Sequence, residues 1–141
     1  MGSGATCGLV MRAVDTNVLV RLMVRDDAEQ LAAAEGFVQA GAWISHLVLM
    51  ETVWVLESVY EVEPGQIAAG LEMLLDHREM VVQEADVVRA AVSQYRERPK
   101  IGFSDCLILE VARVAGHVPL GTFDRALGGL NGAQRLKPQR G

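Results

Sequence analysis

The sequence predicts an α/β protein, a three-layer α/β/α sandwich with a short, mostly parallel central sheet. Short apolar runs typical of buried strands alternate with longer segments whose apolar residues recur at helical spacing. Strands that alternate with helices need crossover connections, which make neighbouring strands parallel and cover the sheet on both faces. The 141 residues are 50% hydrophobic and 22% charged, which excludes a disordered chain. Without any repeat or linker, residues 11–141 are predicted to form a single domain.

In the N-terminal half, residues that cap helix N-termini mark where the predicted helices begin. Asp27 with Gln30 three residues later is a variant of the capping box. Pro64 suits the first turn of a helix. The elements predicted here are a strand at 13–14, a helix over 18–24 capped by Thr16 or Asn17, a helix from Asp27 closed by Gly41, a strand at 42–44, a helix from Ser45 to about Tyr60, and a helix from Pro64 with core positions Ile67, Leu71, Leu74 and Leu75.

In the C-terminal half, apolar periodicity and helix-breaking residues define the elements. Each predicted helix has an apolar face at helical spacing and ends at a proline or a glycine. The elements are a strand at 80–82, a helix with Val87, Val88, Ala91, Val92 and Tyr95 on one face stopped by Pro99, a helix capped by Ser104 that carries Leu107, Ile108, Val111, Ala112 and Ala115 and ends at Gly116, a strand at 118–122, a short helix from Asp124, and a last strand near 135–137.

Charge and cysteine content exclude several classes of protein. The formal net charge of −5 argues against a general nucleic-acid coating protein, which would carry a basic excess. Two cysteines, Cys7 and Cys106, make neither a disulfide framework nor a zinc site and suit a reducing cytoplasm. No uncharged apolar run reaches the roughly 18 residues of a membrane-spanning helix.

Residues 1–10 are interpreted as a disordered extension or a remnant of cloning. Two basic clusters are interpreted as solvated faces or tails, namely Arg96, Arg98 and Lys100, and Arg135, Lys137 and Arg140.

Glu51 is the most informative candidate site residue. It is the only charged residue between Leu47 and Leu56, in a helix that is apolar almost all round. Burial of a lone carboxylate costs too much free energy unless the group is protonated, paired or bound to a metal. A salt bridge to a distant arginine, or a polar stripe on a partly exposed helix, would also explain the residue.

Three further acids stand where parallel sheets place ligand sites. Asp15 and Asp124 each follow a predicted strand, and ligands bind beyond the carboxyl ends of such strands. Asp105 lies in the first turn of a helix. Each of these acids could simply cap a helix, but capping does not explain four acids at comparable places. Clustered carboxylates repel one another, and divalent cations relieve that repulsion. Oxygen ligands favour magnesium or manganese over zinc.

Four segments resemble, in order and spacing, the motifs of the PIN-domain family. The resemblance covers essentially residues 11–137 and is strongest to the compact VapC-type toxins of bacterial toxin–antitoxin pairs. The segments are Ala13-Val14-Asp15-Thr16-Asn17-Val18-Leu19, the stretch 45–56 with Glu51, Phe103-Ser104-Asp105-Cys106-Leu107-Ile108, and Thr122-Phe123-Asp124-Arg125.

This resemblance implies a cytoplasmic, Mg²⁺- or Mn²⁺-dependent endoribonuclease that hydrolyses phosphodiester bonds in structured RNA, such as tRNA or rRNA, through a metal-activated water. It also implies a homodimer inhibited by a VapB-like antitoxin. Trp54 and Val55 are candidates for part of such an interface, although core packing is the favoured role for these two residues. A PIN nuclease of RNA processing and a catalytically silent PIN-like binding module are the alternatives. By the resemblance, the acidic metal-binding and catalytic residues are Asp15, Glu51, Asp105 and Asp124, and the supporting polar residues are Asn17 and Thr122.

Two other classes with acids around magnesium fit less well. A receiver-like domain needs an acidic pair before its first helix, whereas Val14 precedes Asp15, and it needs a lysine late in the sheet, whereas the only lysines are Lys100 and Lys137. A phosphatase with a D-x-D motif fails because Asn17 stands where the second aspartate belongs.

Overall fold

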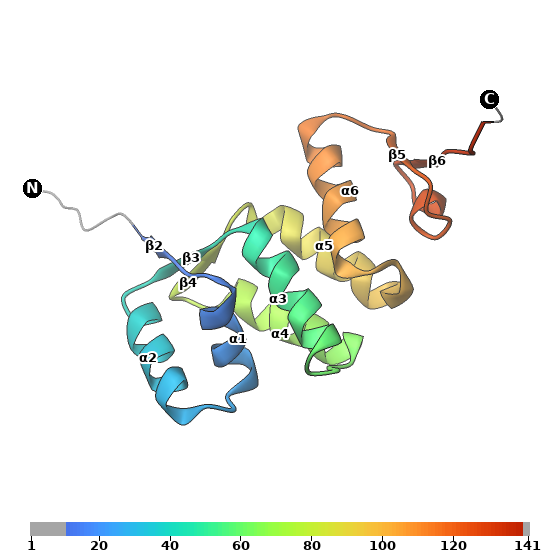
Figure 1. The fold of residues 1–141 in the computed structure, drawn as a ribbon. Helices are drawn as coiled ribbons and strands as arrows, with labels where there is room; N and C mark the ends of the chain where they lie inside the picture. Colours follow the sequence, from blue (N-terminus) through green and yellow to red (C-terminus); the bar gives the residue numbers. More distant parts are fainter. Residues whose placement is uncertain (1–10, 140–141) are drawn as a thin grey trace, which may run out of the picture. The chain divides into compact units, whose positions relative to one another are not determined.

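The computed structural model describes residues 11–139, so the interpretation of residues 1–10 lies outside the described part of the chain. The chain divides into two compact units, Met1–Ala85 and Asp86–Gly141, called here the N-terminal and C-terminal units (Figure 1). Each unit is described by itself. The single domain over residues 11–141 stays a prediction.

Across residues 11–139, none of the helices has the length and apolar character needed to cross a membrane.

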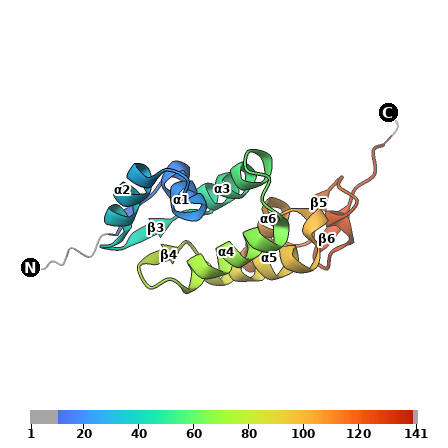
Figure 2. The same cartoon turned by 90° about the horizontal axis from the view of Figure 1, so that it is seen from below.

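The N-terminal unit is built on a three-stranded parallel sheet. Its strands are β2 (Arg12–Ala13), β3 (Ala42–Ile44) and β4 (Met80–Val82), in the order β2-β3-β4. The central strand pairs in parallel with both neighbours, and Figure 2 shows β3 and β4 side by side. Ala42 and Ile44 are fully buried, as expected for a strand covered on both faces. The prediction of short parallel strands is confirmed in this unit.

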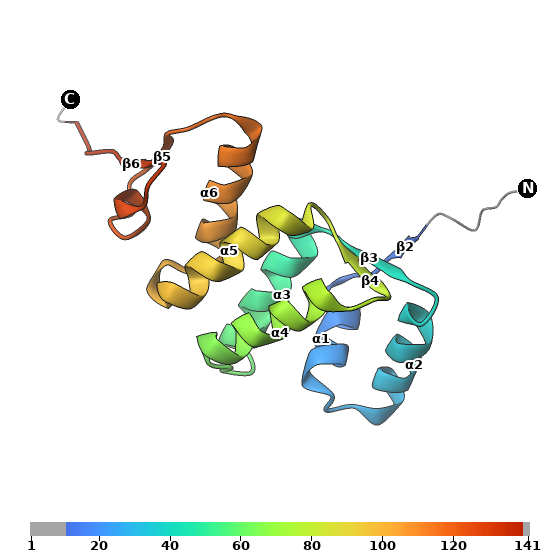
Figure 3. The same cartoon turned by 180° about the vertical axis from the view of Figure 1, so that it is seen from behind.

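Four helices follow or connect these strands: α1 (Thr16–Val24), α2 (Ala28–Val38), α3 (His46–Ser58) and α4 (Pro64–Asp76). α1 and α2 lie side by side (Figure 1), while α4 contacts both α3 and β4 (Figure 3). The predicted caps of α2 and α3 are confirmed: Asp27 accepts from the Gln30 N–H at 3.0 Å and Ser45 from the Val48 N–H at 3.1 Å.

The predicted cap of α1 is wrong. Asp15, rather than Thr16 or Asn17, caps this helix, and its Oδ1 accepts from the Val18 N–H at 3.1 Å. The helix begins two residues earlier than expected, which moves both predicted capping residues into its first turn. A carboxylate satisfies the free N–H groups there and also interacts favourably with the helix dipole.

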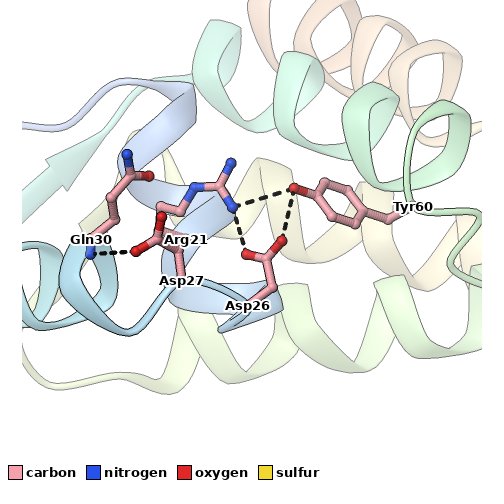
Figure 4. Close-up of polar contacts among 5 residues, drawn as sticks. All are labelled: Arg21, Asp26, Asp27, Gln30 and Tyr60. Atoms are coloured by element: carbon pink, nitrogen blue, oxygen red, sulfur yellow. Dashed lines mark hydrogen bonds and ion pairs between the residues drawn. The ribbon is translucent and has the colours of Figure 1, made fainter.

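A polar cluster joins the C-terminal ends of α1 and α3 (Figure 4). Arg21 Nη1 donates to Asp26 Oδ1 at 2.5 Å and to the Tyr60 hydroxyl at 3.3 Å, and that hydroxyl donates to Asp26 Oδ2 at 3.4 Å. The hydrogen bonds to Tyr60 and then Asp26 raise the pKa of Arg21. Asp27, the next residue, caps α2. The turn formed by Asp26 and Asp27 therefore contacts the ends of α1 and α3 and the start of α2.

The C-terminal unit consists of two α-helices followed by a small sheet. Its elements are α5 (Ala85–Glu97, beginning at the unit boundary), the 3₁₀ turn η1 (Pro99–Ile101), α6 (Phe103–Ala115), β5 (Leu120–Thr122), the 3₁₀ turn η2 (Leu127–Gly129) and β6 (Ala133–Arg135). β5 and β6 pair in parallel. The five predicted core residues of α5 are all buried, and Tyr95 packs edge-on against Phe103 with ring centroids 6.1 Å apart.

Two predictions for α6 are wrong. Ser104 does not cap it, because the helix starts at Phe103 after Gly102, whose φ of +90° is accessible mainly to glycine. The buried face is also different: Ile108 and Val111 are exposed, whereas Leu109 and Cys106 are fully buried. Apolar residues occur on more than one side of this helix, so their spacing could not select the buried face.

Charge is distributed unevenly between the units. Residues 1–85 hold 13 acidic and 4 basic residues, and residues 86–141 hold 5 acidic and 9 basic residues. The formal charges are therefore −9 and +4, which the total of −5 conceals. The formal charge therefore favours anionic partners at the C-terminal unit and cationic partners at the N-terminal unit.

Candidate active site

The first two candidate acids, Asp15 and Glu51, both belong to the N-terminal unit. Asp15 is exposed where β2 leads into α1, and one carboxylate oxygen is fixed by the capping bond. Glu51 on α3 accepts a short hydrogen bond at Oε1 from the Thr16 hydroxyl. Thr16 directly follows Asp15 in the chain. The bond therefore ties the Glu51 carboxylate to the residue next to Asp15.

The expectation that Glu51 is buried is wrong. Its side chain is exposed, on the same face of α3 as Leu47 and Trp54, which are 78% and 62% exposed. Of the explanations weighed above, a polar position on a partly exposed helix fits the burial. What distinguishes Glu51 is its bond to Thr16, not the cost of its burial.

The other two acids lie in the C-terminal unit. Asp105 is in the first turn of α6, and Asp124 follows β5. Desolvation raises the pKa of Asp105, and the negative charge of Asp124 raises it further. The helix N-terminus would by itself favour an ionised carboxylate, so the rise shows that burial and repulsion outweigh it. Asp105 and Asp124 therefore interact as a pair of like charges.

Backbone hydrogen bonds hold Asp124 in place. Its N–H donates to the Thr122 hydroxyl at 3.0 Å, and its Oδ2 accepts at 2.7 Å from the N–H of Leu127, the first residue of η2. This turn lies directly on β6: a Cβ added at Gly128 would be 2.6 Å from the Cβ of Arg135. The close approach requires glycine at position 128 and sets where the Asp124 carboxylate lies.

The supporting residues predicted from the sequence have different surroundings. Thr122 ends β5 and orients Asp124 through the bond just described. Asn17 is exposed in the first turn of α1. Sequence reasoning treated Thr16 only as a capping residue and missed its bond to Glu51. The available signal was a hydroxyl directly after a strand-end aspartate.

Cys106, next to Asp105, is not suited to nucleophilic chemistry. The thiol is buried, and burial together with Asp105 and Glu110 raises its pKa to about 11. It therefore stays protonated at neutral pH, and the thiolate is the reactive form. The chemistry of this site is that of its carboxylates and hydroxyls.

The donor set suits a hard divalent cation. Carboxylate and hydroxyl oxygens are the ligands that Mg²⁺ and Mn²⁺ prefer, and a cation would relieve the repulsion between Asp105 and Asp124. Within the part of the chain that the structure describes, no three His, Cys, Asp or Glu side chains are grouped closely enough to hold a metal. Each unit supplies two of the four candidate acids.

Short parallel strands covered by helices, with carboxylates after β2 and β5, define the class of this protein as an α/β protein with acids at strand ends. The particular family follows from sequence comparison: the model of the PIN domain matches residues 12–131, and the chain belongs to the PIN-domain family. PIN domains are generally metal-dependent nucleases that bind divalent metals. No curated protein matches the chain.

A separate pocket of about 1190 Å³ lies entirely within the N-terminal unit. Its lining comes from the C-terminal halves of α1 and α3, from α2 and from α4, and it includes Leu22, Leu56, Ile67 and Met73. The ion pair between Arg25 and Glu35, with N···O of 3.3 Å, is among the charged groups that line it. Asp15 caps the first turn of α1, whereas residues 22–24 end this helix, so the pocket and Asp15 occupy opposite ends of α1.

Proposed function

We propose that this protein is a Mg²⁺- or Mn²⁺-dependent endoribonuclease, the VapC-like toxin of a toxin–antitoxin pair, that hydrolyses phosphodiester bonds in structured RNA such as tRNA or rRNA. The observation that carries the proposal is the PIN-domain match over residues 12–131 in a chain that has all four candidate acids. Substrates of this kind would place the protein in the cytoplasm.

Asp15, Glu51, Asp105 and Asp124 are the proposed metal-binding and catalytic residues. A divalent cation held by them would supply Lewis-acid stabilisation of the phosphodiester and lower the pKa of the attacking water. The protein's own contribution is to hold the carboxylates: Thr16 orients Glu51, while Thr122 and the Leu127 N–H orient Asp124. Asn17 is proposed as a further polar residue that orders water.

The proposed partner is a basic, VapB-like antitoxin that binds the N-terminal unit. Two observations support this proposal. The unit carries a formal charge of −9, which favours a basic partner. Its pocket of about 1190 Å³, lined in part by apolar side chains such as Leu22, Leu56 and Met73, offers space for apolar side chains of such a partner. We also propose a homodimer, for which the exposed face of α3 with Leu47 and Trp54 is a candidate surface.

Cleavage of total bacterial RNA by the purified, partner-free protein tests the enzymatic proposal. The RNA is incubated in manganese, in magnesium and in excess chelator, and new 5′ ends are sequenced. Discrete cuts are expected with the metal and none in chelator. Asp15→Asn and Asp105→Asn should each abolish cutting, because each removes a charge proposed to hold the cation.

Two matched variants control for loss of a surface carboxylate. Asp27→Asn is the control for Asp15→Asn, because each changes the N-cap of a helix in the N-terminal unit. Asp86→Asn is the control for Asp105→Asn, because each changes an acid in the first turn of a helix. Both controls should cut like the wild type. Full cutting in chelator, or by Asp105→Asn, would overturn the proposal. A folded protein that binds metal but cuts no RNA would favour a catalytically silent binding module.

The toxin role needs a separate test. Expression of the wild-type protein should arrest bacterial growth, whereas the Asp105→Asn protein should not. Growth that continues despite RNA cleavage in vitro would favour a PIN nuclease of RNA processing.

A further inference from the structure

Exposed aromatic side chains are rare in this protein. Of the aromatic residues between positions 11 and 139, only Trp54 and Phe123 are exposed, at 62% and 64%; the others are buried or half-buried. Both stand beside a candidate acid: Trp54 is three residues after Glu51 on α3, and Phe123 directly precedes Asp124. Aromatic residues, including tryptophan and phenylalanine, are enriched on surfaces that a partner covers.

The surroundings of the two rings indicate different partners. Trp54 shares its helix face with the exposed apolar residue Leu47, a composition typical of a protein contact. Phe123 lies between Thr122, which ends β5, and Asp124, and the exposed Arg125 comes two residues after it in the chain. Exposed aromatic rings and cations on one surface are the combination that binds single-stranded nucleic acid.

A second cation is fixed near this turn. Arg135 on β6 is the register partner of Thr122 on β5, and its Cβ lies against Gly128 in the turn that follows Asp124. Arg125 and Arg135 are both exposed, and no ion pair to either is found among the residues that the structure describes. Both guanidinium groups can therefore bind phosphate without breaking a protein contact.

We propose that Phe123 stacks on an unpaired RNA base and that Arg125 binds the adjoining phosphate, so that this turn holds a nucleotide beside the Asp105–Asp124 pair. The inference rests on the proposed ribonuclease function and assigns two residues of this turn to the binding of its substrate. A base inside a duplex already stacks on its neighbours, so only an unpaired base can cover the Phe123 ring.

Binding of a single-stranded oligoribonucleotide containing 2-aminopurine tests the inference, because stacking quenches the fluorescence of this base. The same strand annealed to its complement is the duplex control. All proteins carry Asp105→Asn, so that bound RNA stays intact. The variants are Phe123→Ala, Phe123→Leu, Phe123→Trp and Arg125→Ala, and Val114→Ala is the control for an exposed apolar residue, since Val114 is 63% exposed in the same unit.

Phe123→Ala should weaken single-strand binding by about 5- to 150-fold and abolish the quenching. Phe123→Leu should behave like the alanine variant, because leucine keeps apolar area but has no π face, while Phe123→Trp should restore both binding and quenching. Arg125→Ala should weaken binding and leave the remaining bound fraction quenched. Duplex binding should be the same for all Phe123 variants, and Val114→Ala should have no effect.

Three outcomes would overturn the inference. These are unchanged binding by Phe123→Ala, full binding by Phe123→Leu, and equal losses on single strand and duplex. If wild-type protein cuts RNA in a parallel assay, any of these contradicts the stacking role alone. A wild-type protein that neither binds nor cuts RNA would contradict both this inference and the proposed nuclease.

Discussion

Asp105 is an acid whose charge is unfavourable in the folded protein. Burial and the nearby Asp124 raise its pKa above the ordinary value of 3.8. A group with a higher pKa in the folded than in the unfolded chain destabilises the fold at pH values above both pKa values, and this effect vanishes below both. At neutral pH the ionised Asp105 therefore lowers the free energy of unfolding.

The first prediction is that Asp105→Asn raises Tm at neutral pH in chelator. The gain should shrink as the pH falls towards and below 3.8, where the wild-type carboxyl is protonated in both states. Thermal unfolding followed by circular dichroism across this range measures the change. Asp86→Asn, at the same position of α5, should show no such gain. A less stable Asp105→Asn protein at neutral pH would mean that the Asp105 charge is favourable in the fold.

At the scale of an element, Asp15 has a structural role in addition to its proposed catalytic one. It caps α1 through the Val18 N–H, and asparagine caps helices about as well as aspartate. The second prediction is that Asp15→Asn abolishes cleavage with little loss of stability, while Asp15→Ala also costs about 1 kcal/mol of the free energy of unfolding.

Urea unfolding compared with RNA cleavage separates these two effects. The matched pair is Asp27→Asn and Asp27→Ala at the N-cap of α2. Asp27→Ala should destabilise the protein about as much as Asp15→Ala, but it should leave the cleavage rate of the folded protein unchanged. If Asp15→Asn cuts RNA normally, the role of Asp15 is limited to capping α1 and includes no part in catalysis.

The turn between β5 and β6 depends on glycine for a steric reason. A Cβ at Gly128 would lie 2.6 Å from Arg135 Cβ and 3.0 Å from its Cα, whereas a Cβ at Gly129 would meet nothing within 4 Å. The third prediction is that Gly128→Ala costs about 1–3 kcal/mol of the free energy of unfolding, while Gly129→Ala is close to neutral. Gly128→Ala should also reduce cleavage, because the turn positions Asp124.

Denaturant unfolding measures the free energy of unfolding of Gly128→Ala and Gly129→Ala. RNA cleavage, at a temperature where both variants are folded, measures the predicted loss of activity. Equal stability of Gly128→Ala and Gly129→Ala would show that β6 can move away from the turn without cost. Normal cleavage by a destabilised Gly128→Ala protein would show that the position of Asp124 tolerates that shift.

At the scale of the whole molecule, the uneven charge predicts how RNA binding responds to salt. Contacts between phosphates and cations release counterions, so affinity for single strands falls with salt by a log–log slope of about −0.7 per phosphate. The exposed Arg135 and Lys137 belong to the C-terminal unit, whose formal charge is +4. The fourth prediction is that Arg135→Ala and Lys137→Ala each make the slope about 0.7 less negative.

Fluorescence anisotropy of a labelled oligoribonucleotide over a salt series measures the slope, again with Asp105→Asn in every protein. Arg78→Ala removes an exposed arginine from the N-terminal unit, and its slope should equal that of the unsubstituted protein. A larger change for Arg78→Ala than for Arg135→Ala would place the phosphate contacts on the acidic unit.

The basic clusters also mark a limit of the sequence interpretation. From the sequence, the cluster of Arg135, Lys137 and Arg140 is interpreted as a solvated face or tail, the usual role of short charge clusters. Only the division of the chain into units reveals that the acidic excess belongs to residues 1–85. The interpretation as a tail was reasonable from composition, but it overlooked that Arg135 is held in register with Thr122.

The sequence alone determined the α/β class, the parallel strands, most helix boundaries and the four acids as candidates. These features depend on local pattern: apolar periodicity, capping residues, prolines and glycines act within a few residues of one another. Tertiary structure decided which face of α6 is buried, that Glu51 is exposed and bonded to Thr16, and that Gly128 lies against Arg135. These depend on contacts between segments far apart in the chain, and no local pattern encodes which of several apolar faces such a contact will cover.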